Sequence, residues 1–538
     1  MVMRFAPCLS AMAALRAGLL ALPFLPIVHL AWLSLARDSG LSLSAYAEAA
    51  RPASLLVLGR TAAIAAGASF IALLAGGAAA CVLETRRLPA AGALRLLLLS
   101  PLLLPPVFHV ASWERLAAAD GILAMLAGTP AGEPFPIRNA PFAAIILGIA
   151  YSPIAFFFAS RALRSIAAEL ADAAIVARRP AAAWARVILP LAAPLVATGV
   201  ALIFTLAFLN YETPRLLDVM TYPVLIQVSY GVLDDPGMAF AAALPGLLIA
   251  AAPLVLAGAW AGRKGFAPAA RESAEPLGRG ARDGIAAWVG IAAYLGLTVA
   301  LPIGVLIGLA GPPATYRAAL ATDGEKVLWG TAIVLAAACA SAGCAALVVL
   351  HGPRPRVRLG ALLWMPVALP SALLAYSLVK LLGTGLLFEL YDSPFALALA
   401  GWLRFFPVAC FAAAAHMRGV PEDAWEAAAL GSTRGARWLK ARIPLAVPGL
   451  VTGAAATALL AAGDLPAAVL LAAPGHEPLI VRIYNLLHYD PERDLCAALS
   501  VMHMASVLAV VGVILLAGRR LRRGPTGFTG APGTRSSP

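Results

Sequence analysis

Long apolar stretches, separated by short segments rich in charged residues, proline and glycine, follow one another along the whole chain. Most are about 20 residues or longer, the length that a helix needs to cross the hydrocarbon core of a bilayer. The pattern predicts an all-α membrane protein with about twelve transmembrane helices, six in each half. The predicted spans are 12–36, 56–83, 94–113, 139–160, 192–211 and 238–262, followed by 284–311, 327–350, 359–383, 394–415, 445–472 and 495–518.

Composition leads to the same class of protein. Of the 538 residues, 61% are apolar and 12% are charged, whereas a soluble protein carries about 25% charged residues. A soluble enzyme, a disordered chain and a nucleic-acid binder are excluded on this ground. The formal net charge of +13 therefore calls for an explanation other than a polyanionic partner.

The basic residues follow the topology that twelve spans impose. With the N-terminus in the cytoplasm, 28 of the 40 basic residues fall in cytoplasmic segments, as the positive-inside rule requires. This predicts a multi-pass protein with both termini in the cytoplasm. The expected division is a first transmembrane half at 1–262, a cytoplasmic linker at 263–283, a second half at 284–520 and a disordered cytoplasmic tail at 521–538.

The two halves carry a sequence repeat at an offset of 254 residues. Alanine matches mean little in an alanine-rich chain, but matches of proline, tryptophan and acidic residues at one offset are informative. Because each half holds an even number of spans, the repeats share one orientation and are related by an axis along the membrane normal. The pairs include Pro153 with Pro407, Asp172 with Glu426, Trp184 with Trp438, Pro190 with Pro444, Pro194 with Pro448, and Gly199 with Gly453.

The best-matched block lies in a long cytoplasmic segment between the fourth and fifth spans of each half, at 161–190 and 417–444. In each copy an acidic residue opens an alanine-rich stretch. Such a residue suits a helix N-terminus, and alanine is the best helix former. The residues leave two interpretations open: a short helix that fits a groove in a partner, or an interfacial helix that lies on lipid headgroups.

This block resembles the EAA loop of binding-protein-dependent ABC importer permeases. In that family, the loop is the coupling helix that docks into the ATP-hydrolysing subunit. The first copy departs from the pattern at Ala177, where the family has glycine, and Ile443 precedes Pro444 where the family has leucine. The matching residues are Asp172, Ala173, Ala174 and Ala177 in the first copy, and Glu426, Ala427, Ala428 and Gly431 in the second.

The resemblance implies a type I importer permease in a fused two-half form, in a bacterial inner membrane. It also implies two copies of an ABC ATPase subunit and a periplasmic substrate-binding protein as partners. The chain has no GxxxxGK[ST] phosphate loop, so ATP is expected on the ATPase partner, and we expect no cofactor, catalytic residue or metal site on this chain.

The cargo is predicted from three further segments, which resemble the ferric-iron permeases. They are 210–214, 404–407 and 463–466, with the sequences NYETP, RFFP and GDLP. Iron(III) is the favoured cargo; thiamine, whose permeases share the fused layout, and other small solutes are alternatives.

Charged residues at membrane depth mark the candidate translocation pathway. Asp464 is expected well inside the eleventh span and Arg404 near the middle of the tenth, while Asn210 matches Asp464 at the repeat offset. Such residues usually face a bundle interior or a water-filled cavity. An ion pair between Arg404 and Asp464 that merely joins two helices is the alternative interpretation.

A proton-coupled secondary transporter is the rival function. That class needs titratable carboxylates inside the membrane, and the sequence places only one there, Asp464. Paired prolines, Pro101 with Pro105 and Pro366 with Pro370, are expected to break or kink the third span of each half. The three histidines inside spans, His29, His109 and His503, are interpreted as packed polar residues.

Overall fold

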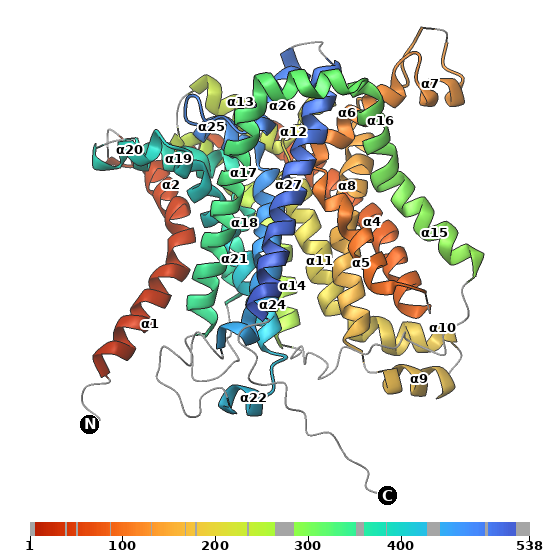
Figure 1. Ribbon diagram of the computed structural model, residues 1–538. Helices are drawn as coiled ribbons and strands as arrows, with labels where there is room; N and C mark the ends of the chain where they lie inside the picture. The colour runs from red at the N-terminus through yellow and green to blue at the C-terminus, as the bar shows by residue number, and fades with distance from the viewer. Residues whose placement is uncertain are drawn as a thin grey trace, which may run out of the picture.

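A computed structural model of the chain is almost entirely helical (Figure 1). Its only strands in the described residues are β1 (Ala36–Arg37) and β2 (Gly40–Leu41), which form a two-residue antiparallel pairing. The structure describes residues 6–37, 40–49, 52–86, 88–130, 132–166, 168–177, 180–233, 236–263, 284–350, 360–383, 385–427, 442–489 and 493–522.

The helices before residue 264 are α1 (Ala6–Ala21), η1 (Leu22–Phe24), α2 (Leu25–Leu35), α3 (Ser44–Ala49), α4 (Pro52–Thr85), α5 (Ala91–Leu99), η2 (Ser100–Leu103), α6 (Pro106–Ala117), α7 (Ile122–Ala127), α8 (Ala140–Arg164), α9 (Ala168–Ala177), α10 (Pro180–Ala183), η3 (Trp184–Ile188), α11 (Leu189–Phe208), α12 (Glu212–Leu216), α13 (Tyr222–Leu233) and α14 (Pro236–Arg263).

Those after residue 283 are α15 (Ile285–Leu295), η4 (Gly296–Ala300), α16 (Leu301–Ala310), α17 (Pro313–Leu350), η5 (Ala361–Trp364), α18 (Met365–Ala368), α19 (Ser371–Leu382), η6 (Gly385–Leu387), α20 (Phe388–Tyr391), α21 (Pro394–Met417), α22 (Glu422–Ala427), α24 (Ile443–Ala462), α25 (Leu465–Leu471), α26 (Leu479–Tyr489) and α27 (Arg493–Arg522).

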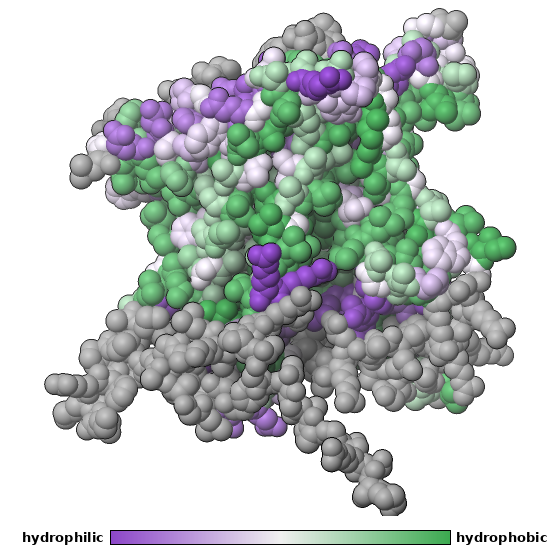
Figure 2. Space-filling model, viewed as in Figure 1, coloured by the Kyte–Doolittle hydropathy of each residue, from purple (hydrophilic) through white to green (hydrophobic). Residues whose placement is uncertain are grey.

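Within the described residues, ten helical segments are long and apolar enough to cross a membrane, and two bent pairs raise the number to as many as twelve. Each predicted span overlaps one of these segments, so the prediction of an all-helical, multi-pass membrane protein is confirmed. On the face shown in Figure 2, an apolar belt crosses the bundle, with more polar side chains above it and below it. This is the surface that a protein embedded in a bilayer presents to lipid and to water.

Two predicted boundaries in the second half are wrong. The seventh span was expected to begin at residue 327, but α17 begins at Pro313, because a helix continues beyond the apolar stretch that the pattern detects. The eleventh was expected to reach residue 472, but α24 ends at Ala462 and a separate short helix, α25, follows.

The third span of each half is broken where the paired prolines predict. In the first half, the helices on either side of residues 104–105 make an angle of 81°, and in the second those around residues 369–370 make an angle of 90°. Pro105 and Pro370 each precede the first residue of the outer helix. Because proline lacks a backbone N–H and fixes its own φ, it starts a helix well but cannot continue one.

Two prolines inside other spans, Pro190 and Pro302, are each preceded by a widened turn. A π-helical turn, η3, ends two residues before Pro190, and a second one, η4, ends two residues before Pro302. The widened turn absorbs the hydrogen bond that proline cannot make. Through η3 the fifth span continues back to Ala181, instead of starting at residue 192 as expected.

Corresponding helices of the two halves make corresponding contacts. Helix α4 packs on α8 and α11, as α17 packs on α21 and α24. The first helix of each half also crosses to the other half: α1 and α2 contact α17 and α19, and α15 and α16 contact α4 and α6. In Figure 1, α1 and α15 lean away from the bundle on opposite flanks.

A matched pair of glycines explains one feature of the repeat. A Cβ on Gly199 would lie 2.6 Å from the Phe158 Cβ on α8, and a Cβ on Gly453 would lie 2.7 Å from the Ala409 Cα on α21. Only glycine therefore allows α11 and α24 to approach their neighbours this closely, as small residues do in membrane helix packing.

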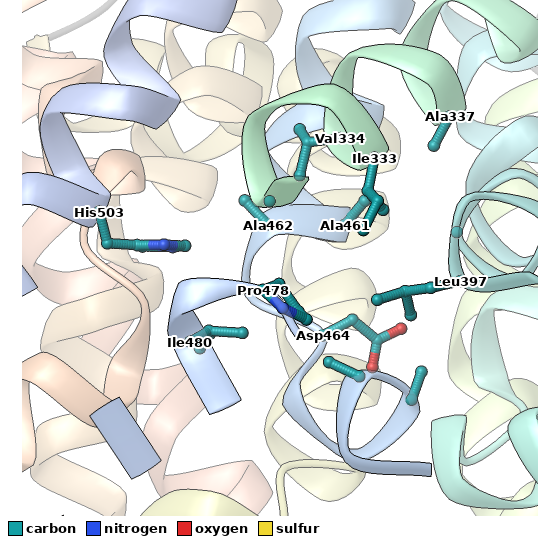
Figure 3. Close-up of a pocket in the computed structure, with 14 residues that line it drawn as sticks. Ile333, Val334, Ala337, Leu397, Ala461, Ala462, Asp464, Pro478, Ile480 and His503 are labelled. Carbon is teal, nitrogen blue, oxygen red and sulfur yellow. The ribbon is translucent and has the colours of Figure 1, made fainter. Parts of the chain in front are cut away.

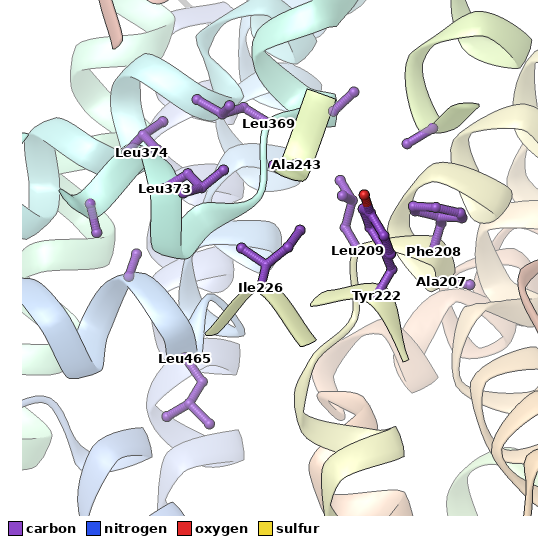
Figure 4. Close-up of a cluster of buried hydrophobic side chains, with 14 of the residues drawn as sticks. Ala207, Phe208, Leu209, Tyr222, Ile226, Ala243, Leu369, Leu373, Leu374 and Leu465 are labelled. Atoms are coloured by element: carbon purple, nitrogen blue, oxygen red, sulfur yellow. The ribbon is translucent and has the colours of Figure 1, made fainter. Parts of the chain in front are cut away.

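The largest cluster of buried apolar side chains joins residues from both halves. Figure 4 shows Leu209 and Ile226 of the first half near Leu369 and Leu373, which belong to the break in the third span of the second half. Leu465, at the start of α25, belongs to the same cluster. The middle of the molecule is therefore closed by apolar packing between the halves.

Candidate functional site

The first copy of the repeated cytoplasmic block forms α9, which contains Asp172, Ala173, Ala174 and Ala177. Ala171 is fully buried and packs with residues at the ends of α8 and α11, while Ala173 is exposed. Helix α9 lies below the bundle in Figure 1. One face of α9 therefore packs against the ends of α8 and α11, and the other face is exposed.

The second copy begins with α22, which ends at Ala427 and carries Glu426 in an exposed position. Trp425, at the position that matches Ala171, is 2% exposed, and the Arg442 guanidinium lies 4.5 Å from the centre of its indole ring. Ala428 and Gly431 lie outside the described residues.

The two copies therefore share one design in the part that the structure describes. The residue before the acid, Ala171 or Trp425, is buried against the ends of the neighbouring spans. Ala173 in the first copy and Glu426 in the second copy are exposed. Both short helices lie on the same side of the bundle (Figure 1), which we call the α9–α22 face.

Arg404 and Asp464 form a buried ion pair. Arg404 Nη1 donates to Asp464 Oδ2 at 2.8 Å, and the two residues are 6% and 9% exposed. Arg404 lies near the middle of α21, as predicted. The prediction that Asp464 lies inside a span is wrong. Asp464 lies in the break between α24 and α25, where it precedes the first residue of α25.

The break at Asp464 has a local cause. Pro466 is the second residue of α25 and cannot donate an N–H back to residue 462. The chain therefore leaves the helix after Ala462 and starts a new one at Leu465. Asp464 therefore lies beyond the end of the spanning helix α24, at the start of α25.

Asn210 occupies the equivalent place after α11, and a second carboxylate accompanies it. Asn210 Nδ2 donates to Glu212 Oε2 at 2.8 Å, and Asn210 Oδ1 accepts the backbone N–H of Thr213 at 3.0 Å. Both Asn210 and Glu212 are 7% exposed. The sequence analysis did not single out Glu212; its signal is its place two residues after the repeat-matched asparagine.

The two polar pairs meet in one cluster across the halves. Glu212 lies within electrostatic reach of Asp464 and Arg404, and Tyr151 of α8 lies near Asn210 and Glu212. Burial raises the pKa of the Glu212 carboxyl to about 7, and the negative charge of Asp464 adds to the rise. We call Tyr151, Asn210, Glu212, Arg404 and Asp464 the seam cluster.

A cavity of about 30 Å³ adjoins the seam cluster. The Asp464 carboxylate and the His503 ring of α27 both line it, among mainly apolar residues of α17, α21, α24, α25 and α26 (Figure 3). The His503 Nε2 atom is buried and has no hydrogen-bond partner. This volume holds about one water molecule and nothing larger.

The other intramembrane histidines are packed among neighbours. His29 Nδ1 lies 2.8 Å from Ser377 Oγ, a contact between α2 and α19, and His109 is fully buried. Within the described ranges, the His, Cys, Asp and Glu side chains form no group of three that could hold a metal ion.

The fold and the seam cluster define a multi-pass helical membrane protein, consistent with a transporter. No protein-family model matches the chain, and no curated protein matches it by sequence.

Proposed function

We propose that the chain is the transmembrane permease subunit of an ATP-binding-cassette importer. It would move a small solute across a bacterial inner membrane, with both chain termini in the cytoplasm. The observation that carries the proposal is the pair of matched short helices on the α9–α22 face, each fastened by one buried residue beside an acidic Ala-Ala motif. Two such helices suit two copies of an ATPase subunit.

The mechanism follows from the arrangement of the halves. ATP binding draws the two ATPase subunits together, and α9 and α22 move with them. Because Ala171 and Trp425 pack against the ends of the spans, that motion is transmitted to α8 and α11 in one half and to α21 and α24 in the other. The halves then rock apart at the apolar cluster of Figure 4 and open the cavity outward.

The cargo is the finer part of the proposal. Iron(III), delivered by a periplasmic binding protein, is favoured through the resemblance of residues 210–214, 404–407 and 463–466 to the ferric-iron permeases, with thiamine or another small solute as the alternative. The seam cluster, which includes Asn210, Arg404 and Asp464, would line the route. Selectivity would rest mainly on the binding protein.

A charge-reversal experiment tests the coupling helices. The double variant Asp172→Lys/Glu426→Lys should lose co-purification with its ATPase subunit, because the acidic residue of each short helix is replaced by a basic one. Glu133→Lys is the matched control, since Glu133 is exposed on a loop far along the chain from both helices. Retained association and uptake in the double variant would refute the assignment.

A proton-coupled secondary transporter is the second candidate. The observation that favours it is Glu212, which gives the seam cluster a second buried carboxylate beside Asp464. Transporters of that class use intramembrane carboxylates as proton carriers. Uptake that stops when the proton gradient is collapsed while ATP is maintained would support it over the ATP-driven importer.

A further inference from the structure

The seam cluster contains more acid than base. It contains two carboxylates, Glu212 and Asp464, and one guanidinium, Arg404. Arg404 binds Asp464 at 2.8 Å, and Glu212 interacts electrostatically with both. All three residues are less than a tenth exposed. If both carboxylates were ionised, one negative charge would be buried without compensation, which is unfavourable at low dielectric.

The groups around Glu212 come from several elements. Tyr151 on α8 and the pair of Arg404 and Asp464 lie within its electrostatic reach. Tyr484 on α26 also interacts with the charge of Glu212. It interacts as well with Tyr211 and Arg215, which lie beside Glu212 in the sequence.

Helix α6, which also packs against α12, carries three further ionisable residues. His109 is fully buried. Glu114 bonds Arg138, and Arg115 bonds Asp120. The arginine of α6, Arg115, is therefore already paired with a carboxylate, that of Asp120.

We propose that Glu212, together with the Arg404–Asp464 pair, forms a proton-binding site between the two halves, which holds one proton on Glu212 while the halves are packed together and releases it when they separate. The inference rests on the proposed function for the motion that separates the halves. It adds a ligand, the proton, to that cycle.

The position of the site explains the coupling. Glu212 and its partner Asn210 belong to the first half, whereas Arg404 and Asp464 belong to the second. Separation admits water and moves Glu212 away from Asp464, and both changes favour the ionised carboxyl. The O–H bond of the Glu212 carboxyl breaks, its electron pair stays on the carboxylate, and water takes the proton.

The balance of forces on Glu212 agrees with this assignment. Backbone amides of Tyr211 and Glu212 and the charge of Arg404 favour the ionised form, but burial outweighs them and leaves the pKa at about 7. A group with that pKa gains and loses its proton in the physiological range, as a conformation-linked site requires.

Infrared spectroscopy of the purified chain tests the site directly. The C=O stretch of a protonated carboxyl is recorded while the pH is raised from about 5 to about 9. We expect a band that disappears with a midpoint near the Glu212 pKa of about 7. Glu212→Gln should lack it, and Glu133→Gln, an exposed carboxyl, should keep it.

A second variant separates proton binding from a merely structural role. Asp464→Asn removes the neighbouring negative charge that raises the pKa of Glu212, so the midpoint should move to lower pH. A band that Glu212→Gln leaves unchanged, or a midpoint that Asp464→Asn leaves in place, would overturn the inference.

The outcomes also separate this inference from the proposed function. If ATP-driven uptake is intact but the titrating band is absent, the proton site is wrong and the importer stands. If the band behaves as expected but uptake depends on the proton gradient and not on ATP, the importer is wrong and the proton site belongs to a secondary transporter.

Discussion

The buried pair of Arg404 and Asp464 yields the most specific prediction about stability. The two side chains meet at 2.8 Å, and at 6% and 9% exposure neither residue has water to replace a lost partner. Removing one member leaves the other as an unpaired buried charge. Arg404→Gln and Asp464→Asn should therefore each lower the free energy of unfolding by about 3–5 kcal/mol.

The double replacement should behave differently. Arg404→Gln with Asp464→Asn removes both charges, keeps similar shape and lets the two amides hydrogen-bond each other, so no unpaired charge stays buried. We expect the double variant to unfold within about 1 kcal/mol of the parent chain, or to be more stable. Unfolding in mixed micelles of increasing SDS content, followed by tryptophan fluorescence, gives all four values of the cycle.

The cycle also decides between a structural pair and a pathway pair. If the pair only joins α21 to the α24–α25 break, the stable double variant should transport normally. The account predicts that it folds but does not transport, because the route has lost its charges. Single variants that each cost less than about 1 kcal/mol would refute the reasoning, since that is the range of a hydrated surface pair.

Three further predictions use the same unfolding assay or a binding assay. Gly76→Ala places a Cβ 2.0 Å from a carbonyl oxygen of α8 and should destabilise by about 1–3 kcal/mol, whereas Gly59→Ala on the same helix meets open space and should stabilise by about 0.5–1 kcal/mol. Arg95→Gln removes both hydrogen bonds of the bidentate pair with Glu84, which is 4% exposed, and should cost about 3 kcal/mol or more; a cost near zero would show that water replaces the arginine. Trp425→Ala removes the buried anchor of α22 and should weaken ATPase association in a pull-down even though Glu426 is retained; unchanged association would contradict the anchoring role.

The spans and their breaks could be predicted because their causes are local. Apolar length sets a membrane helix, and the paired prolines Pro101 with Pro105 and Pro366 with Pro370 coincide with the breaks in the two third spans. The start of α17 at Pro313 could not be found this way. Helix formation continues into polar sequence, where no contrast of hydropathy marks the boundary.

The seam cluster could be predicted only in part. Arg404 and Asp464 stand out as charges in apolar surroundings, and their pairing was one of two open interpretations. Glu212 follows the fifth span and looks like an ordinary loop residue until α12 folds back against α6 and α8. Its burial, and hence its pKa, depends on helices far away in the sequence, which no local pattern reveals.

The short helices α9 and α22 illustrate the same limit. Their existence follows from an acid at the head of an alanine-rich stretch. Which face is fastened depends on Ala171 and Trp425 reaching the ends of neighbouring spans. The repeat offset links these two residues, but only the packing shows that both are anchors.

The measurement that tests the central claim most directly is uptake of labelled ferric iron and, separately, of labelled thiamine, in cells with and without this gene. The proton gradient is collapsed while ATP is maintained, and Asp172→Lys/Glu426→Lys is assayed beside the parent chain. The account predicts gene-dependent uptake of one label that survives the collapse and is lost in the double variant. Gene-dependent uptake that stops when the gradient is collapsed, or that persists in the double variant, would contradict it.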